Sequence, residues 1–499
     1  MVPLALGGAL VAALSSRATM FPGPHGRGVR TGASPGGSGG RNRGARWARR
    51  RDLCPLLVGA ASTPPGRLVL GVSPGIVRAA GVAAERSQSL VVVGPTQSGK
   101  TTRLAVPAIL GWQGPVVAAS VKSDLLHQTL GTCRRRGQVW CVDPSGSTVV
   151  RRSRWSPLSG CDDWPRACRV AADICEAAKA DGTTADGEFW YSTAAKLLAP
   201  LFFAAALEHR SMPDVVRWVD TQEIAEVSGI LERAEHPESL HAAQATWYRD
   251  ERTRSSVFTT AETVLAPFAR EAPVSGPPFE PVDLLGAANT LFLCAPAHDQ
   301  RRLRGYFTTI TQQVLGHAFT ASTRAGRALD PPLLVVLDEA AHIAPLPELD
   351  GLAATCASHG IQLVTIWQDL AQVRGRYGAR APTVLNNHRA KLFLPGIADP
   401  DTLDYASRLI GDEEIAQPSV TRDATGRRST TSTTGSRRLL PPEELRCLPR
   451  GHAVLVYGTL PPARLRLRAW TGEGGSRRSR RSRRGRAHLT RRRRRALPE

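Results

Sequence analysis

The sequence predicts an α/β fold with a mainly parallel sheet that is interrupted by an all-helical insertion. Three observations support this prediction. Short apolar runs alternate with helical stretches along most of the chain, and one long internal segment lacks such runs. Strands that are buried on both faces of a parallel sheet have this continuous apolar character. A glycine-bounded loop also follows one of these runs and opens a helix, which is typical of phosphate binding in α/β proteins.

The parallel sheet is predicted from seven short apolar runs. These runs are Leu90–Val93, Val116–Ser120, Val139–Val142, Thr290–Cys294, Leu333–Leu337, Leu363–Trp367 and Lys391–Leu394. Two further short strands, Arg67–Leu70 and Ile76–Ala80, are expected before them. A helix at Pro441–Cys447 and a hairpin of Ala453–Gly458 with Ala463–Trp470 are expected after them, since proline opens helices and alternating apolar residues form strands.

The alternation stops in the segment between the third and fourth of these strands. Alanine-rich helical periodicity replaces it there, for example in FWYSTAAKLLAPLFFAAALEH. We expect further helices at Pro213–Val219, Gln222–Ala234 and Ser239–Ala266. The sequence therefore predicts two domains: a nucleotide-binding domain formed by residues 56–158 and 281–470, and an inserted all-α domain at 159–280.

The two ends of the chain and one internal segment have other compositions. Residues 1–15 contain an apolar stretch, Leu4–Leu14, that is shorter than the ~20 residues of a membrane helix, so it is either a truncated membrane anchor or an apolar terminus. Residues 16–55 are predicted as a flexible basic linker, and Arg422–Arg438, rich in Ser, Thr and Arg, as a mobile loop. Residues 471–499 are predicted as a disordered Arg-rich tail.

The charge of the chain indicates a polyanionic partner. The formal net charge is +22, and twelve arginines lie in the last 23 residues, whereas the whole chain has only five lysines. This tail is either a solvated segment without a binding role or a contact for DNA or anionic lipid, and because it has no aromatic residue other than His488 it would not stack on bases or read a sequence. The nine cysteines form no CxxC pair, which argues against a disulfide framework or a zinc site.

The loop GPTQSGKT, Gly94–Thr101, fits the phosphate-binding pattern G-x-x-x-x-G-K-[ST]. Its glycines let successive backbone N–H groups face a phosphate, and the following helix directs its positive end at the same anion. Lys100 would reach the β and γ phosphates of ATP, and the Thr101 hydroxyl would bind Mg²⁺. The predicted nucleotide-binding residues are Gly94, Pro95, Thr96, Gln97, Ser98, Gly99, Lys100, Thr101 and Thr102.

Two other strand ends carry polar residues that fit this chemistry. Asp338 and Glu339 end the strand LLVVL, and ligands of open α/β sheets lie at the carboxyl ends of strands. Asp338 is predicted to hold Mg²⁺, and Glu339 to orient and polarise the attacking water, so the pair favours hydrolysis. Gln368 follows the next strand and is either a γ-phosphate sensor or an ordinary strand-end residue. Glu339, Lys100 and Gln368 are the predicted catalytic residues.

Several stretches, in this order between Gly66 and Trp470, resemble the coupling ATPases of type IV secretion and conjugation systems, the TraG/TraD-like family. The stretches that carry the resemblance are VVVGPTQSGKT, SVKSDLL, VDPSG, FWYSTAAKLLAPLFFAAA, LDEAAHIAPLPELDGLAATCASHGIQLVTIWQDLAQ and RRLLPPEELRCLPRGHAVLVYGTLPPARLR. The resemblance implies a RecA-like P-loop NTPase domain with an all-helical domain that faces the cytoplasm.

The resemblance also implies partners and a location. Members of this family are anchored in the bacterial inner membrane on its cytoplasmic side, assemble as homohexamers, recruit a relaxase–DNA complex or a protein effector, and use ATP to drive transfer into a secretion channel. The family often has an arginine before the glycine that opens the Gln strand, whereas Ser358 and His359 precede that glycine here. An arginine finger, which would act on the nucleotide of a neighbouring subunit, is therefore either absent or replaced by another arginine. The candidates for a replacement are Arg374, Arg376 and Arg380.

Two other functions fit parts of the sequence. One is an FtsK- or HerA-like translocase of duplex DNA, against which the helical insertion and the LLPPEEL hairpin argue. The other is a nucleotide-binding adaptor with little ATPase activity, which the missing arginine favours and the pair Asp338–Glu339 disfavours. The leading prediction is a coupling ATPase that binds DNA without sequence preference, and single-stranded DNA is the expected form.

Overall fold

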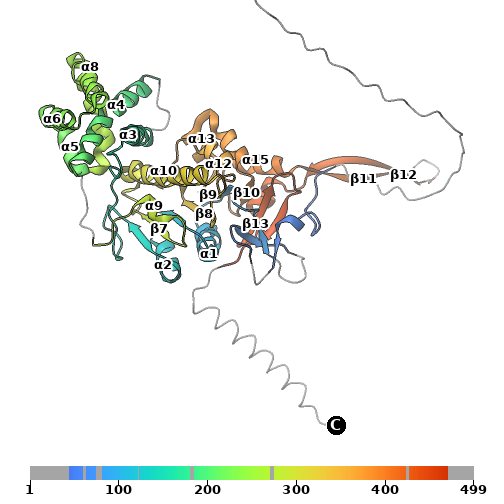
Figure 1. The fold of residues 1–499 in the computed structure, drawn as a ribbon. Coiled ribbons are helices and arrows are strands. Elements are labelled where there is room, and N and C mark those ends of the chain that lie inside the picture. The colour runs from blue at the N-terminus through green and yellow to red at the C-terminus, as the bar shows by residue number, and fades with distance from the viewer. Residues whose placement is uncertain are drawn as a thin grey trace, which may run out of the picture. The chain divides into compact units, whose positions relative to one another are not determined.

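The computed structural model describes residues 44–469, apart from 60–62, 75–80, 122, 180–184, 270–274, 423–425 and 427. The predicted apolar segment at 1–15 and the Arg-rich tail at 471–499 lie outside these residues. The described residues form a 12-stranded sheet with helices on both faces and a separate two-stranded ribbon. A group of helices is inserted in the chain between two successive strands of the large sheet (Figure 1).

Seven neighbouring strands of the sheet run parallel, in the order β10–β4–β9–β8–β5–β7–β6. Their residues are mostly apolar and buried, as expected for strands covered on both faces. Their bounds are β4 (Leu90–Val93), β5 (Val116–Ser120), β6 (Val139–Val142), β7 (Thr290–Cys294), β8 (Leu333–Asp338), β9 (Ile361–Trp367) and β10 (Ala390–Phe393). The seven strands predicted from apolar runs are therefore confirmed, with small differences at the ends of β8, β9 and β10.

An antiparallel extension continues the sheet beyond β10, in the order β13–β14–β2–β3–β1. Its strands are β1 (Leu57–Val58), β2 (Val69–Val72), β3 (Gly81–Ala83), β13 (His452–Tyr457) and β14 (Ala463–Arg466). The C-terminal hairpin is confirmed, and α16 (Pro442–Arg446) precedes it. The strand predicted at Arg67–Leu70 is displaced to β2, and the one predicted at Ile76–Ala80 lies outside the described residues.

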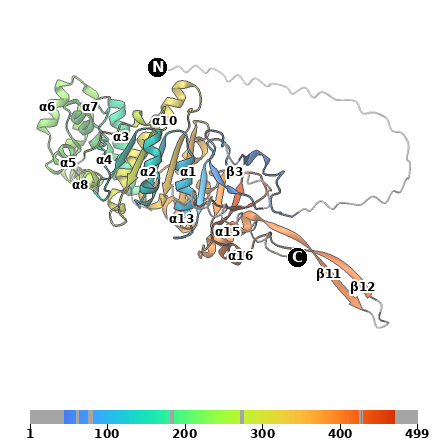
Figure 2. The same ribbon diagram turned by 90° about the horizontal axis from the view of Figure 1, so that it is seen from below.

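The two faces of the sheet belong to two hydrophobic clusters, because successive strand residues point to opposite sides. Val92 lies in the cluster covered by α1 (Val106–Gly111) and α2 (Asp124–Arg136), which lie side by side in Figure 2. Val93 lies in the cluster that contains α10 (Gln300–Ala325). That face also carries α9 (Pro281–Leu284), α11 (Ala340–Ile343), α12 (Leu349–Thr355), α13 (Leu370–Tyr377), α14 (Ala381–Asn387) and α15 (Pro400–Ile410).

Six α-helices occupy the described part of the segment between β6 and α9 (Figure 1). They are α3 (Trp164–Ala178), α4 (Ala185–Leu207), α5 (Met212–Asp220), α6 (Ala225–Arg233), α7 (Pro237–Trp247) and α8 (Glu251–Leu265). The helix predicted at Ser239–Ala266 is thus two helices, because the Asp250 side chain accepts a hydrogen bond from the Thr253 N–H and starts α8. The bounds of a separate domain at 159–280 stay a prediction.

The central helix of this group is α4, which packs against α3, α7 and α8. Within the described part of the chain it is the one helix whose length and apolar composition would allow it to cross a membrane. However, 61% of its apolar window is buried in the structure, as in the core helix of a helical domain. Leu197, Leu198 and Phe202 are fully buried at its centre.

The predicted flexible linker at 16–55 is wrong in its C-terminal part, which lies against the sheet. The guanidinium of Arg464 lies 4.3 Å from the ring centroid of Trp47. Arg46 donates two hydrogen bonds to Asp52, at 2.6 and 2.9 Å. The arginine-rich composition suggested a solvated segment, but a guanidinium can also stack on an aromatic ring or pair with a carboxylate.

The predicted mobile loop at Arg422–Arg438 is also wrong, because most of it is a β-strand. β11 (Asp412–Arg422) and β12 (Arg428–Arg438) form an antiparallel ribbon that starts at the pair Asp412↔Arg438. These two residues also form an ion pair at 3.0 Å. The ribbon is a separate two-stranded sheet. Its sequence therefore does not show the alternation of apolar and polar residues that is typical of a strand with one buried face.

Gly360, which precedes β9, provides a test of the packing. Its φ is +76°, and a Cβ atom there would lie 2.6 Å from the backbone nitrogen of Leu329. We expect Gly360→Ala to lower the free energy of unfolding by about 2 kcal/mol or more, because backbone strain and overpacking add. Gly131 in α2 is the control, since a Cβ there meets only a flexible Arg135 nitrogen at 3.8 Å.

Chemical denaturation of both variants measures this difference. Gly131→Ala should raise the free energy of unfolding by up to about 1 kcal/mol, since alanine is the better helix former. Equal effects of the two substitutions would show that Gly360 is not constrained by its contact with Leu329.

Candidate nucleotide-binding site

The three motifs predicted to act together lie on neighbouring strands. β9 pairs in parallel with β4 on one side and with β8 on the other, and Val93 is opposite Trp367. The carboxyl ends of these strands therefore lie at one edge of the sheet. The structure brings together at this edge the loop that starts at Gly94, the Asp338–Glu339 pair and Gln368.

The phosphate loop has a tight backbone with two residues of positive φ, Gln97 (63°) and Gly99 (95°). Gly94 allows close packing, since a Cβ atom there would lie 2.7 Å from the Cβ of Leu394. The N–H of Gly94 donates to the Trp367 carbonyl at 3.0 Å, which ties the loop to β9. The loop leads into a π-helical turn, Thr101–Ala105, and then into α1.

Lys100 lies folded back over the loop. Its ammonium donates a hydrogen bond to the Gly94 carbonyl at 2.7 Å, and only 7% of the residue is exposed. The ammonium is therefore positioned over the start of the loop, where backbone N–H groups of such loops face phosphate oxygens.

Asp338 is the buried acidic group of the site. Its carboxylate accepts hydrogen bonds from the Thr101 hydroxyl at 2.8 Å and from the Ser120 hydroxyl at 3.4 Å. Burial raises the pKa of this carboxyl above its ordinary value, and Glu339 adds to the rise, whereas Thr101, Lys100 and Ser120 oppose it. The site therefore holds a carboxylate whose negative charge is disfavoured by burial until a cation approaches.

Ser120 was not predicted as a site residue. It ends β5, and in the parallel register of β5 and β8 it lies directly opposite Asp338. A polar residue at the end of the apolar run VVAAS is the signal for it, but choosing it required the pairing of β5 with β8.

Glu339 has a left-handed backbone, with φ 70° and ψ 58°. This conformation is uncommon for a residue with a side chain, and such strain is concentrated at functional sites. Glu339 lies between Asp338, the last residue of β8, and the short helix α11, and its side chain is half-buried.

Gln368 is connected to α11, the helix that follows Glu339, through two residues that were not predicted as site residues from the sequence. Its backbone N–H donates to the Gln372 side-chain oxygen at 2.9 Å, and the Gln372 amide nitrogen lies 3.4 Å from His342 Nε2. His342 is in α11, directly after Glu339 and two alanines. The spacing of Gln368 and Gln372 by four residues suits a contact within one turn, but the link to His342 depends on the fold.

The oxygen atoms at this edge fit a magnesium ion. Mg²⁺ prefers oxygen ligands and is commonly held by one or two protein groups together with phosphate oxygens. The Thr101 hydroxyl and the Asp338 carboxylate, 2.8 Å apart, are two such groups. Within the described residues no cluster of three or more His, Cys, Asp or Glu residues could hold a metal by itself, so the remaining ligands would come from a nucleotide and from water.

The three arginines considered for a trans-acting role each contact groups of their own chain. Arg374 pairs with Asp401 at 2.5 Å, and Arg380 with Asp350 at 3.3 Å. Arg376 donates to the Pro345 carbonyl at 3.3 Å. A role of any of them in a neighbouring subunit stays a prediction.

The strand order, the phosphate loop and the acidic strand end define a P-loop NTPase with a RecA-like fold. The chain belongs to the family described as Type IV secretory system Conjugative DNA transfer, whose sequence model matches residues 67–471. The resemblance inferred from the sequence motifs is thereby confirmed.

Relatives with known names agree with this family. The conjugal transfer protein TraG of Agrobacterium fabrum (strain C58 / ATCC 33970) is 25% identical over 391 residues, which cover 74% of this chain and 58% of TraG. Protein VirD4 of the same organism is 24% identical over 405 residues, which cover 77% of this chain and 58% of VirD4. The chain thus matches about three fifths of the length of these relatives.

A solved structure has the same fold. The bacterial conjugative coupling protein TrwBdeltaN70, in its unbound monoclinic form, matches with a TM-score of 0.65 at 20% identity. The match covers 88% of this chain and 96% of that one.

The buried carboxylate predicts a pH effect on stability. Because the pKa of Asp338 is raised in the folded chain, the folded state binds more protons than the unfolded state between the two pKa values, and stability falls as pH rises through that interval. We expect Asp338→Asn, without nucleotide or divalent cation, to be more stable than wild type at pH 7, and this gain to vanish at acid pH.

Urea unfolding at several pH values measures this gain. Asp283→Asn, at an exposed aspartate in α9, is the control and should change stability little at any pH. A loss of stability in Asp338→Asn at neutral pH would mean that the hydrogen bonds of the carboxylate outweigh its burial.

Proposed function

We propose that the chain binds Mg²⁺-ATP at the carboxyl edge of β4, β9 and β8 and hydrolyses it. The observation that carries this proposal is the 2.8 Å hydrogen bond between the Thr101 hydroxyl and Asp338, which joins the phosphate loop to the acidic strand end. The loop residues Gly94–Thr102 hold the phosphates, with Lys100 on the β and γ phosphates. Thr101 and Asp338 hold Mg²⁺, which when bound neutralises charge on the phosphate oxygens.

Hydrolysis needs a group that positions water beside the γ phosphate. Glu339 has this role in the proposal, because it adjoins Asp338 and its strained backbone fixes it at the strand end. Its carboxylate accepts a hydrogen bond from the water and orients it for in-line attack. The products are ADP and inorganic phosphate.

Gln368 is proposed as the γ-phosphate sensor. It directly follows β9, the strand between β4 and β8, and its N–H donates a hydrogen bond to Gln372, which lies 3.4 Å from His342 of α11. A change at Gln368 on loss of the γ phosphate would therefore alter the contacts of α11, which adjoins Glu339. This coupling is a proposed role of residues that the fold holds in contact.

The cellular role proposed for the chain is that of a coupling protein in conjugation or type IV secretion. Membership in the conjugative DNA transfer family supports it, as do TraG and VirD4 among the relatives. Structures of TrwB are described as complexes with ADP and Mg²⁺ and with the non-hydrolysable ATP analogue ADPNP, both with a TM-score of 0.59 to this chain.

In this role the chain recruits a relaxase-bound or other substrate and drives single-stranded DNA, without sequence preference, into the secretion channel. It acts as a homohexamer on the cytoplasmic face of the bacterial plasma membrane. These partners and this location are proposed from the family and from the excess of positive charge.

The central test is ATP hydrolysis by the full chain with and without single-stranded or duplex DNA. We expect Lys100→Ala to lower turnover by at least about 100-fold, as for loss of one transition-state donor. Glu339→Gln should keep nucleotide affinity and lower turnover by about 100- to 10,000-fold, since it loses the proton acceptor for water. Glu262→Gln, at an exposed residue of α8, is the matched control and should match wild type.

The outcome also separates the other functions. Stimulation by single-stranded DNA supports the coupling protein, whereas stimulation by duplex DNA alone supports an FtsK- or HerA-like translocase. Tight ATP binding without turnover, at concentrations at which a ring forms, would contradict both and leave the adaptor.

A further inference from the structure

A polar cleft lies between α3, at the start of the inserted helices, and α10, which covers the sheet. Its volume is about 920 Å³. Three arginines, two glutamines and a histidine are among its lining residues, with Asp163 and Asp173 as its acidic members. The basic and amide members are Arg166, Arg169, Gln312, Gln313, His317 and Arg324. Nothing in the nucleotide chemistry described above uses this cleft.

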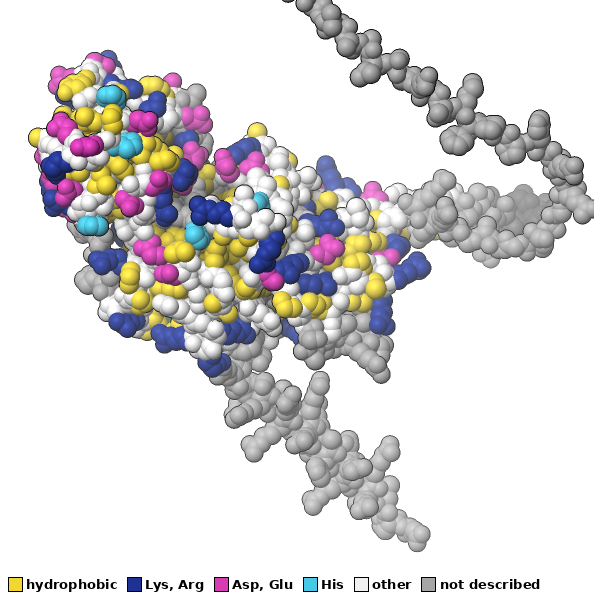
Figure 3. Space-filling view, in the orientation of Figure 1, with side chains coloured by type: hydrophobic (Ala, Val, Ile, Leu, Met, Phe, Trp, Pro, Cys, Tyr) yellow, Lys and Arg dark blue, Asp and Glu magenta, His cyan; other side chains and the backbone are white. Residues whose placement is uncertain are grey.

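The arginines of the cleft are not neutralised by ion pairs. Within the described residues, no ion pair of 4 Å or less joins the guanidinium of Arg166, Arg169 or Arg324 to a carboxylate, although Arg169 attracts the nearby Asp173 and the backbone N–H of Arg166 donates to Asp163 at 3.1 Å. With both aspartates ionised and the histidine neutral, the lining still carries one positive charge in excess. In Figure 3, Lys and Arg side chains and a histidine lie together in the hollow between the inserted helices and the rest of this face. The cleft is therefore suited to an anion.

Two residues that line the cleft also carry a side-chain oxygen without a hydrogen-bond partner. The side-chain oxygens of Gln312 and Gln313 are buried and have no hydrogen-bond partner among the described residues. Buried polar atoms of this kind are normally paired with protein, water or a ligand.

The lining contains no Phe, Tyr or Trp, and His317 is its one aromatic side chain, so the cleft offers no series of rings on which successive bases could stack. Contacts would be made mainly by guanidinium groups with phosphates, which does not depend on sequence. A cleft of about 920 Å³ would admit a few nucleotides of a single strand but is too small for a duplex, whose major groove alone is about 12 Å wide.

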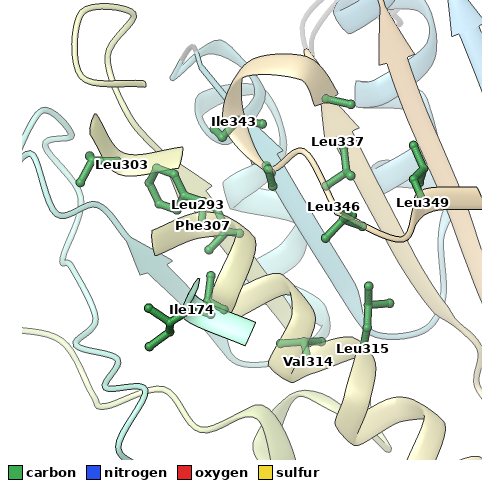
Figure 4. Close-up of a cluster of buried hydrophobic side chains, with 14 of the residues drawn as sticks. Ile174, Leu293, Leu303, Phe307, Val314, Leu315, Leu337, Ile343, Leu346 and Leu349 are labelled. Atoms are coloured by element: carbon green, nitrogen blue, oxygen red, sulfur yellow. The ribbon is translucent and has the colours of Figure 1, made fainter. Parts of the chain in front are cut away.

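The walls of the cleft are packed onto the end of β8. The labelled side chains of Figure 4 include residues of α3 (Ile174), α10 (Phe307, Val314), β8 (Leu337) and α11 (Ile343), which belong to one buried cluster. α10 packs against both α3 and α11, and α11 starts directly after Glu339. A ligand that moves α3 relative to α10 would thus press on the segment that carries Asp338 and Glu339.

We propose that the α3–α10 cleft binds the sugar–phosphate backbone of single-stranded DNA and transmits its presence to the nucleotide site. Arg166, Arg169 and Arg324 hold successive phosphates. This inference rests on the proposed function as a DNA-handling ATPase, and it assigns the DNA contact to a folded surface rather than to the Arg-rich tail.

Two titratable groups make the binding depend on pH. Burial raises the pKa of Asp173 to about 6, with Glu348 and Glu176 adding to the rise and Arg169 opposing it. Burial, together with Arg166 and Arg324, lowers the pKa of His317. Asp173 gains protons between pH 8 and pH 6, whereas the lowered pKa of His317 shifts its protonation to more acidic pH, so the loss of the Asp173 charge should increase affinity for a phosphate backbone over this range.

The salt dependence of binding tests the proposal on the full chain. Fluorescence anisotropy with a labelled oligothymidylate gives the association constant at each salt concentration. The slope of its logarithm against the logarithm of salt concentration is negative, and its magnitude decreases by about 0.7 for each phosphate contact that is lost. We expect the triple variant Arg166→Ala, Arg169→Ala and Arg324→Ala to reduce this slope by about 2. Wild type should then lose about 20-fold more affinity than the variant between 50 and 200 mM salt.

Two control variants separate the cleft from general charge loss. One carries Arg134→Ala, Arg252→Ala and Arg468→Ala, at exposed arginines outside the cleft, and should keep the wild-type slope. The other replaces the three cleft arginines by lysine and should restore the slope, because charge is retained. The triple alanine variant should also lose stimulation of ATP hydrolysis by single-stranded DNA while keeping basal turnover.

Two results would overturn the proposal while the proposed function survives. In the first, DNA stimulates ATP hydrolysis by wild type, and the triple alanine variant shows the same salt slope and the same stimulation as wild type. The other is that polyglutamate, an acidic peptide, loses binding in the cleft variant while oligothymidylate does not, which would assign the cleft to a protein substrate. If wild type itself shows no stimulation by any DNA, the proposed function fails first.

Discussion

The hydrogen bond between Thr101 and Asp338 is the contact on which the site depends. It joins a loop after β4 to the end of β8, although β9 lies between these strands. The contact is possible because the three strands are parallel and in register, so their polar ends meet at one edge. The raised pKa of Asp338 indicates that this arrangement disfavours the charged carboxylate, a cost that a bound cation would remove.

The second constraint is the position of α10. This helix covers one face of the sheet and is packed between α3 and α11, so the inserted helices and the segment after Glu339 share one hydrophobic core. Closely packed side chains do not deform independently, which makes such a core a suitable route between a DNA contact and a nucleotide site. The inserted helices therefore share buried side-chain contacts with the sheet domain, although the sequence distinguished them by their separate composition.

Much of the sheet, and most of the residues that the structure brings together in the candidate site, were predictable from sequence. Strands buried on both faces appear as apolar runs, and the phosphate loop has fixed residue types, so β4 to β10 and Gly94–Thr101 were found. The ribbon β11–β12 was missed because it has no buried face to impose alternation. Ser120 and Gln372 were missed because their roles depend on contacts between separate strands and helices, which no local pattern encodes.

The most direct test of the account is calorimetric titration of ATP into the full chain, with Mg²⁺ and with EDTA, for wild type and Thr101→Ala. The account predicts that Mg²⁺ strengthens binding to wild type by about 10-fold or more and has little effect on the variant, since the Thr101 hydroxyl and Asp338 hold the ion together. The same affinity with and without Mg²⁺ in wild type, or an unchanged Mg²⁺ effect in Thr101→Ala, would contradict it.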